Sequence, residues 1–304
     1  MPKLLLTGAN GFVGRSLAQR LAERGEIARI SRLRLGSPQP TDWSAALQDI
    51  YCVVHLAARV HVMSETSVDP LTSFRAVNTR GTLELARQAA VAGVKRFLYA
   101  SSIKVNGELT SAGESFRHDD SPHPLDAYGV SKRDAEIGLR AIAVETGMEI
   151  VIIRPPLVYG PGVKANFAAM MRAIQRGLPL PLAAVTQNRR SLVSLDNLVD
   201  LLITCIDHPA AANQTFLVSD GEDLSTADLL RRLGDAMGKP ARLFPVPVPL
   251  LRAGAALIGK QGVAQRLLDN LQVDISHTRE TLGWTPPITV DEGLRRAVAG
   301  LRRS

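Results

Sequence analysis

The segment DAYGVSKRDAE, residues 126–136, places a tyrosine, Tyr128, four residues before a lysine, Lys132. On a helix this spacing is about one turn, so the phenol and the ammonium group share a face. A free phenol has a pKa of about 10, and a nearby cation lowers it by about one to three units, towards the range useful for proton transfer at neutral pH. The pair is therefore a candidate for acid–base chemistry. The structural alternative is two polar residues on a helix.

The helix that carries this pair also has an apolar stripe, formed by Val130, Ile137, Ala141 and Val144 at helical spacing. We expect the pair to be turned away from that stripe. Upstream, RFLYASSIKVNG is an apolar strand that ends in two serines, at 101 and 102. Because open α/β sheets bind ligands at the carboxyl ends of their strands, a serine here can join the site.

A glycine-rich turn lies near the amino terminus. LLLTGANGFVGRSLAQRLAERG gives a strand, then Gly8, Gly11 and Gly14, then a helix with Leu17 and Leu21 on one face. Such a turn lets a pyrophosphate approach the backbone at the start of the helix. The alternative is a glycine turn selected only for packing.

The order of the elements predicts the fold. The runs KLLLTG, IARIS, CVVHLAA, RFLYASS and EIVIIRPP alternate with helix-like segments, which indicates parallel strands joined by crossover helices. We predict an α/β fold, a Rossmann-type doubly wound parallel sheet with a smaller mixed α/β C-terminal substrate lobe. The dinucleotide-binding domain is expected over residues 1–160 and the lobe over 161–304, interleaved and with a soft boundary.

The spacing Gly-x-x-Gly-x-x-Gly within TGANGFVG resembles the extended short-chain dehydrogenase/reductase family. Aligning SIKVNG with the family's Ser-x-x-Val-Tyr-Gly selects Ser102, 26 residues before Tyr128, over Ser101. The resemblance implies that Tyr128 exchanges a proton with the substrate oxygen, that Ser102 hydrogen-bonds this oxygen, and that Lys132 also holds the nicotinamide ribose. Hydride then moves between the nicotinamide and a substrate carbon.

The cofactor prediction depends on the end of the segment EIARISR, where NAD-binding proteins carry an acidic residue. Ser31 and Arg32 stand there, which favours NADP(H), with NAD(H) as the alternative if Arg32 points into solvent and Asp42 or another acid serves the adenosine. Asn78 matches the family's Asn near the active site; the alternative is a helix Asn bonded to local backbone. The expected cofactor-binding residues are Gly8, Asn10, Gly11, Phe12, Val13, Gly14, Ser31, Arg32, Leu56, Ala57, Ala58, Asn78, Tyr128, Lys132, Pro155 and Val158.

Two further segments, IIRPPLVYGPGVKANFAAM and NRRSLVSLDNLVD, resemble the branch of the family that acts on nucleoside diphosphate sugars. The resemblance places Asn166 at the diphosphate and Arg190, with Arg189 second, at the nucleotide phosphates. Asn106 stands where 4-epimerases have Tyr, and Lys104 lies nearby. We therefore expect Lys104, Asn106, Asn166 and Arg190 to bind substrate, although a surface or capping role for the arginine is the alternative.

These motifs look closest to bacterial 4-keto reductases that make UDP-N-acetylquinovosamine for surface polysaccharides. That likeness implies NADPH-dependent reduction of a UDP-linked 4-keto-6-deoxy-N-acetylhexosamine at carbon 4. One alternative is a nucleotide-sugar 4-epimerase, or a dehydratase, that retains NAD. Another is a non-catalytic protein that senses the dinucleotide.

The composition favours some classes of binding partner over others. The chain has a formal charge of +7, from seven Lys and 29 Arg against 29 acids, and only 4% aromatic residues. The chain has no basic run with interleaved aromatic residues, so it is a poor candidate for binding nucleic acid. A UDP-sugar is a better candidate, because the planar guanidinium of Arg suits contact with its phosphates. Cys52 and Cys205 are expected to be reduced and packed, and no metal is expected.

We predict a soluble, cytoplasmic protein. The apolar segment VPVPLLRAGAALIG, residues 246–259, is too short for a transmembrane helix, although a role at a membrane surface stays open. The family resemblance implies a homodimer through paired helices, one of which bears Tyr128.

Overall fold

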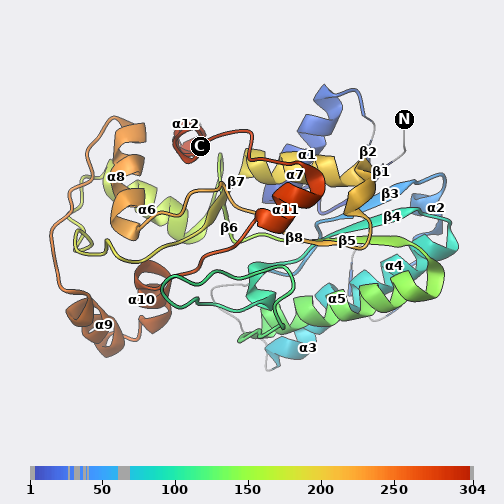
Figure 1. Ribbon diagram of the computed structural model, residues 1–304, viewed down its shortest axis with the longest axis horizontal. Coiled ribbons are helices and arrows are strands. Elements are labelled where there is room, and N and C mark those ends of the chain that lie inside the picture. The colour runs from blue at the N-terminus through green and yellow to red at the C-terminus, as the bar shows by residue number, and fades with distance from the viewer. Residues whose placement is uncertain are drawn as a thin grey trace.

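The protein is described by a computed structural model that covers residues 4–26, 28–30, 35–36, 39, 41–60 and 69–301. Its main sheet has six parallel strands in the order β2-β1-β3-β4-β5-β8 (Figure 1). The strands are β1 (Leu4–Thr7), β2 (Ala28–Ile30), β3 (Cys52–His55), β4 (Arg96–Ala100), β5 (Glu149–Arg154) and β8 (Thr215–Leu217). The five predicted strands are confirmed, and the parallel, Rossmann-like sheet is the predicted fold class.

Helices cover both faces of this sheet (Figure 1), which is why its strands are apolar almost throughout. One face carries α1 (Phe12–Glu23) and α7 (Leu195–Asp207), and the other carries α4 (Thr82–Val91) and α5 (Ala127–Thr146). Successive strand residues point to opposite faces: Leu4 and Leu6 pack with α1 and α7, whereas Leu5 packs with α4 and α5. Short elements complete this half, namely α2 (Ser44–Leu47), α3 (Pro70–Phe74), the π-helix η1 (Arg75–Gly81) and the 3₁₀ helix η2 (Ile103–Val105).

The chain returns to the main sheet after residue 160. Helix α7 packs on the sheet, and β8 pairs with β5 at its edge. The other late elements form a smaller lobe, at the left of Figure 1, around the two-stranded parallel sheet β6-β7. These are β6 (Leu157–Tyr159), α6 (Ala165–Gln175), β7 (Leu192–Ser194), α8 (Thr226–Met237), α9 (Val248–Leu257), α10 (Gln261–Leu268) and α12 (Val290–Leu301). The 3₁₀ helix η3 (Pro209–Ala211) and α11 (Ser276–Leu282) lie beside β8.

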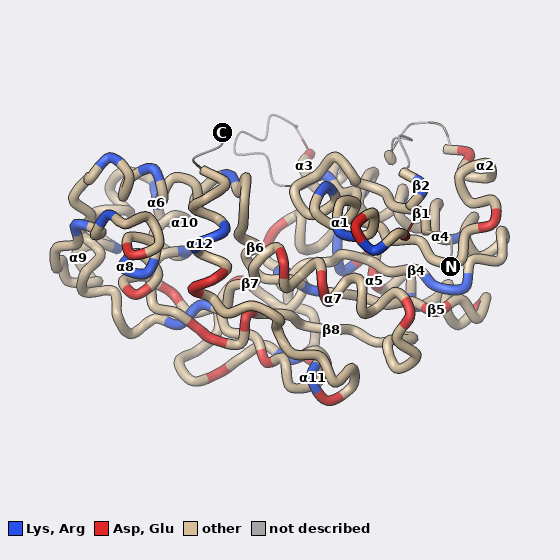
Figure 2. Tube along the Cα trace, turned by 90° about the horizontal axis from the view of Figure 1, so that it is seen from above, with Lys and Arg blue, Asp and Glu red and all other residues tan. Residues whose placement is uncertain are grey.

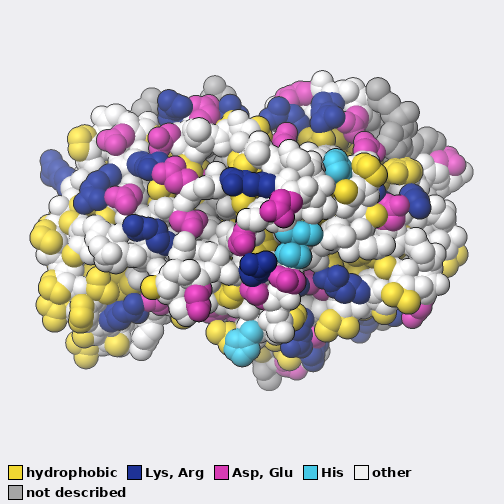
Figure 3. Space-filling model, in the orientation of Figure 1, with side chains coloured by type: hydrophobic (Ala, Val, Ile, Leu, Met, Phe, Trp, Pro, Cys, Tyr) yellow, Lys and Arg dark blue, Asp and Glu magenta, His cyan; other side chains and the backbone are white. Residues whose placement is uncertain are grey.

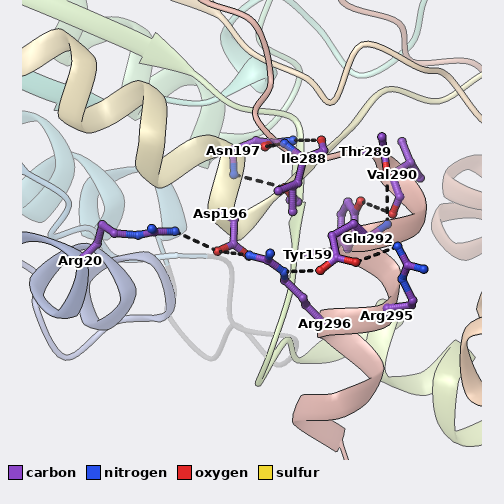
Figure 4. A network of polar contacts seen from close by, with 11 residues as sticks. Arg20, Tyr159, Asp196, Asn197, Ile288, Thr289, Val290, Glu292, Arg295 and Arg296 are labelled. Atoms are coloured by element: carbon purple, nitrogen blue, oxygen red, sulfur yellow. Dashed lines mark hydrogen bonds and ion pairs between the residues drawn. The ribbon is translucent and has the colours of Figure 1, made fainter. Parts of the chain in front are cut away.

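Charged side chains join the lobe to the sheet domain where α1, α7 and α12 meet. Figure 4 shows Asp196, in the first turn of α7, between Arg20 of α1 and Arg296 of α12. Arg296 also contacts Glu292 one turn earlier on its own helix. Nearby, the Asn197 amide donates to the Ile288 carbonyl at 3.0 Å. Contacts from three helices thus fix the lobe against the sheet.

The predicted apolar stripe on α5 is wrong. Ile137, Ala141 and Val144 are exposed, and Val130 is only half-buried. The residues that α5 buries include Ser131, Lys132, Ala135, Glu136, Leu139 and Ile142. The buried face therefore includes charged groups, because hydrogen bonds and an ion pair inside the protein compensate them. Lys132 points into the protein, and the apolar residues point to solvent.

Candidate active site

Helix α5 presents Tyr128 and Lys132 in its first turns. The Asp126 side chain caps this helix by accepting a hydrogen bond from the Gly129 amide at 2.7 Å. The Lys132 ammonium donates to the carbonyl of Ala100, the last residue of β4, at 2.7 Å, and lies 5.9 Å from the Tyr128 ring centre. Cap and lysine together hold the start of α5 at the carboxyl end of β4.

The two serines after β4 have different partners. Ser102 lies close enough to the phenol of Tyr128 to lower its pKa. Ser101 is buried, and its hydroxyl donates to the Glu136 carboxylate at 2.5 Å. The structure thus brings Ser102, Tyr128 and Lys132 together at the carboxyl end of β4. Ser101 is not part of this group, because its hydroxyl is bonded to Glu136.

Burial is the largest influence on the pKa values of Tyr128 and Lys132. It raises the pKa of Tyr128; the charge of Asp126 adds to this, and nearby Ser102 opposes it. Burial also lowers the pKa of Lys132 to about 7, against an upward effect of Glu136. The expectation that Lys132 lowers the pKa of the phenol is therefore wrong for the protein alone. Desolvation of the phenol outweighs the effect of the charged and polar groups around it.

A buried ion pair that we did not predict lies behind the trio. Arg154, at the end of β5, contacts Glu136 of α5 through two nitrogens, at 2.6 and 3.0 Å. Both side chains are 3% exposed. The same carboxylate accepts from Ser101 and raises the pKa of Lys132. The sequence held one signal: Glu136 follows Lys132 by four residues, so both share a helix face.

Asn106 belongs to this buried network. Its side-chain oxygen accepts from Arg154 at 3.0 Å, and its amide donates to the Arg117 carbonyl at 2.8 Å. We expected Asn106 to contact substrate, but its side chain is 97% buried and bonds at both ends within the protein. It ties the loop that precedes α5 to the strand that carries Arg154.

Asn78 connects three segments. It lies in the π-helix η1, a geometry often found at functional sites. Its side chain accepts from the Arg59 amide at 2.8 Å and donates to the Arg59 carbonyl at 3.0 Å. It also donates to the Ser131 hydroxyl of α5 at 3.0 Å. The partners of Asn78 are thus 19 and 53 residues away in the sequence, so the alternative of an Asn bonded to local backbone is wrong. Through Arg59, Asn78 orients the chain that follows β3.

The glycines of the first turn meet strict steric limits. Gly8 has φ of 72°, and a Cβ there would lie 2.6 Å from the Ala57 amide nitrogen. A Cβ on Gly14 would lie 2.1 Å from the Gly8 carbonyl oxygen. Both glycines are therefore required by packing in this structure. Gly11 is exposed and begins α1 without a side-chain cap, and the first turn has no acidic residue, so this helix start suits a phosphate.

The other predicted cofactor residues are spread over the same edge of the sheet. Asn10 is exposed in the glycine turn, and Phe12 and Val13 are half-buried at the start of α1. The half-buried residues at 56–58 follow β3 directly, and Pro155 and Val158 follow β5. Leu56, Ala57 and Ala58 therefore share the carboxyl edge with the trio. Ser31 and Arg32 lie outside the described residues.

His55, at the end of β3, is a packed residue. Its two ring nitrogens lie 2.8 Å from the Thr7 hydroxyl and 3.0 Å from the Thr82 hydroxyl. Burial and the charge of Lys132 lower its pKa to about 3, so the imidazole is neutral. The two cysteines are also packed as predicted, with free thiols at Cys52 and Cys205.

The predicted substrate residues lie in different surroundings. Lys104 is half-buried and pairs with Asp126 and Glu108. Asn166 is in the first turn of α6, directly after Ala165, whose φ of 54° is strained for a non-glycine residue. Arg190 is half-buried, and its guanidinium donates to the Asp269 carbonyl at 3.1 Å. Arg189 is exposed and bonds to carbonyls of its own loop.

Comparisons with known proteins give independent evidence on the family of this chain. A family model described as the NAD dependent epimerase/dehydratase family matches residues 4–219. UDP-glucose 4-epimerase of Vibrio cholerae is 50% identical over 310 residues, covering 97% of this chain and 94% of that protein. Among solved structures, UDP-glucuronic acid 4-epimerase from Bacillus cereus in complex with NAD superimposes with a TM-score of 0.79, at 20% identity and 99% coverage of both chains. RMD from Pseudomonas aeruginosa complexed with NADPH gives a TM-score of 0.76, at 23% identity, covering 98% of this chain and 99% of that one.

Proposed function

Because the chain belongs to the NAD dependent epimerase/dehydratase family, we propose that it is a nucleotide-sugar 4-epimerase that inverts carbon 4 of a UDP-linked hexose. The membership confirms the resemblance to the extended short-chain dehydrogenase/reductase family, and the chain is an NAD(P)-dependent enzyme of the epimerase or oxidoreductase type. The observation that carries the proposal is the 50% identity to a UDP-glucose 4-epimerase along almost the whole chain.

The chain's own residues would divide the work as follows. A bound nicotinamide dinucleotide supplies the hydride acceptor and donor for carbon 4. Tyr128 takes the proton of the O4 hydroxyl as the hydride leaves carbon 4, and it returns that proton when hydride is restored to the opposite face. Ser102, which lies beside the phenol, holds the same oxygen, and Lys132 positions the ribose. The net reaction consumes no dinucleotide.

We place the cofactor along the carboxyl edge of the main sheet. The uncapped start of α1, at Gly11, receives its pyrophosphate, and the chain after β3, oriented by Asn78, lies beside it. The retained cofactor of an epimerase favours NAD(H), while Ser31 and Arg32 favour NADP(H). Mass spectrometry of the dinucleotide released from the purified protein distinguishes the two.

The two halves of the chain are proposed to bind different ligands. Residues 1–160 are proposed to bind the dinucleotide, and residues 161–304 the sugar nucleotide, although α7 and β8 return to the sheet. Arg190 and Asn166 are the proposed phosphate contacts. The half-buried guanidinium of Arg190 suits this role better than the exposed Arg189.

A keto reductase is the second candidate, favoured by one observation. Ser31 and Arg32 stand where NAD-binding proteins carry an acidic residue, which favours the NADPH that a reductase consumes. This candidate is NADPH-dependent reduction, at carbon 4, of a UDP-linked 4-keto-6-deoxy-N-acetylhexosamine for surface polysaccharides.

One experiment separates these candidates and also tests the first. The purified protein is given UDP-glucose or UDP-N-acetylglucosamine without added dinucleotide, and the product is resolved by chromatography. Appearance of the 4-epimer supports the epimerase. Stoichiometric loss of added NADPH with a 4-keto sugar nucleotide, and no epimer from the first assay, would replace it with the reductase. Full biological function of Tyr128→Phe would instead favour a dinucleotide sensor.

We also propose a homodimer in the cytoplasm. Val91 of α4 and Val144 of α5 are 91% and 89% exposed, and Ile137 on α5 is exposed as well. Val144 and Ile137 lie on α5, the helix bearing Tyr128 that the family resemblance pairs between subunits, and α4 packs beside it. A charge on this face, in Val144→Glu, should convert a dimer to a monomer when molar mass is measured by light scattering.

A further inference from the structure

The outer end of the lobe, formed by α9 and α10, exposes apolar side chains that the reaction does not use. Figure 1 shows α9 at the far end of the molecule from the main sheet, and hydrophobic side chains gather at the corresponding edge of Figure 3. No residue of α9 is fully buried. Leu250 is 63% exposed, Leu257 88% and Ile258 71%. This end therefore leaves apolar surface in contact with water.

The outward face of α9 carries no charge. Leu250, Ala253, Gly254 and Leu257 are all exposed and follow one another at the spacing of a single helix face. The inward face is different: Val248 and Leu251 pack against the core of the lobe. Arg252, the one charged residue of α9, forms an ion pair with Asp269 at the end of α10. The helix thus has two apolar faces and only one of them is covered.

The segment that forms this face carries charge of a single sign. Residues 239–268 contain five cations, Lys239, Arg242, Arg252, Lys260 and Arg266, and no Asp or Glu. All five are exposed, and Arg252 alone among them forms an ion pair within the described part of the chain. Figure 2 shows basic segments around this end of the lobe. An apolar face bordered by cations matches the surface of an anionic membrane.

A second copy of the chain fits this face poorly. A two-fold contact would place the same acid-free segment against itself, and cations would then oppose cations. The proposed dimer face on α4 and α5 differs in this respect, because α4 carries Glu84 and Arg87 and α5 carries Asp134 and Arg140. No helix in the described ranges is long and apolar enough to cross a membrane. Helix α9 has ten residues, a length of about 15 Å, against about 30 Å for the hydrocarbon core of a bilayer, so its apolar face suits the surface of a membrane.

We propose that α9 and α10 dock the protein reversibly on a membrane containing anionic phospholipids. Leu250, Leu257 and Ile258 enter the boundary between headgroups and acyl chains. Lys260 and Arg266 contact the lipid phosphates. Docking does not depend on which sugar nucleotide the enzyme uses, and a failed activity assay leaves it unaffected.

The test is sedimentation of the full chain with vesicles of phosphatidylcholine alone, or of phosphatidylcholine with phosphatidylglycerol. We expect binding to the anionic vesicles only, weakened by added salt. The double variant Leu250→Ser/Leu257→Ser should lower the partition coefficient about tenfold or more. The variant Lys260→Gln/Arg266→Gln should lower it about tenfold on anionic vesicles.

A matched control is Leu109→Ser, which removes a half-exposed leucine outside α9 and α10. It should sediment with the vesicles as the unaltered protein does, and thermal unfolding should show that all variants fold. Absence of binding to anionic vesicles overturns the proposal, as does equal binding to both vesicle types or an equal loss in the control. A concentration-dependent rise in molar mass that Leu250→Ser/Leu257→Ser abolishes, without vesicle binding, would assign the face to a second copy instead.

Discussion

Two ion-pair networks in this protein use the same residue types in opposite surroundings. Behind the trio, Glu136 and Arg154 are each 3% exposed, and they bond to Ser101 and Asn106 as well as to each other. At the joint between α1, α7 and α12, Asp196 is 22% exposed while Arg20 and Arg296 are 47% and 41% exposed (Figure 4). Water replaces a lost partner at the joint but not in the interior.

This difference separates two roles for charge. A buried pair that loses one partner leaves an uncompensated charge, which costs far more than the intact pair contributes. An exposed pair contributes little because solvent and salt screen it. The interior pair also acts on chemistry, since Glu136 raises the pKa of Lys132, whereas the joint pair acts only on how the lobe is held. The predictions below test this contrast.

Breaking the interior pair should give the largest effect. Arg154→Met removes the cation and leaves the Glu136 carboxylate buried, so we expect a loss of about 3–5 kcal/mol in the free energy of unfolding. The double variant Glu136→Gln/Arg154→Met should recover part of that loss. Chemical denaturation of the three proteins measures it. A double variant no more stable than Arg154→Met would mean that packing, not the uncompensated charge, sets the cost.

Removing the hydroxyl of Tyr128 should affect activity about as strongly and stability hardly at all. Tyr128→Phe deletes the group that exchanges the proton, and the turnover number should fall about 10³-fold. Dinucleotide binding should be retained because Lys132 and the start of α1 are unchanged. Turnover and bound dinucleotide are measured on the same preparation. Activity within a few-fold of the unaltered protein would remove the phenol from the mechanism.

The fold was predictable because it depends on patterns that the sequence displays directly. Five apolar runs gave the five strands β1 to β5, and the glycine spacing gave the turn before α1. The trio was predictable from Tyr128, Lys132 and Ser102 together, each at a strand end or helix start. The strands and the glycine turn follow from local sequence and from general rules of strand order, whereas the choice of Ser102 over Ser101 came from the family resemblance.

The interior network was not predictable because it depends on burial of polar residues. Ile137 and Val144 looked like the core face of α5, yet solvent surrounds them, while Lys132 and Glu136 lie inside. Hydrophobic periodicity places charged residues outside by default, and only the partner Arg154, 18 residues away, reverses that. The same omission explains the wrong direction for the pKa of Tyr128, since the phenol's desolvation is a property of the folded protein.

The pH dependence of stability tests the coupling of the interior pair to Lys132. Burial lowers the lysine pKa from 10.5 to about 7, so between these values the unfolded chain binds more protons than the folded one. Stability should therefore rise with pH across this window, by at most about 1.4 kcal/mol per pH unit, and the contribution should be flat below pH 7. The free energy of unfolding of Lys132→Met at each pH is subtracted from that of the unaltered protein, and the difference gives the contribution of Lys132. Because Glu136 raises this pKa, Glu136→Gln should extend the window to lower pH, and an unchanged window would uncouple the two residues.

Breaking the joint pair should give the smallest effect and so completes the contrast. Arg296→Ala removes the contacts to Asp196 and Glu292, both of which remain accessible to water. We expect a loss below about 1 kcal/mol in the free energy of unfolding, and a smaller loss at high salt. Asp196→Ala, which also frees Arg20, is the matched variant and should behave alike. A loss as large as that of Arg154→Met would show that exposure does not decide what an ion pair contributes in this fold, because geometry at the joint would then outweigh screening.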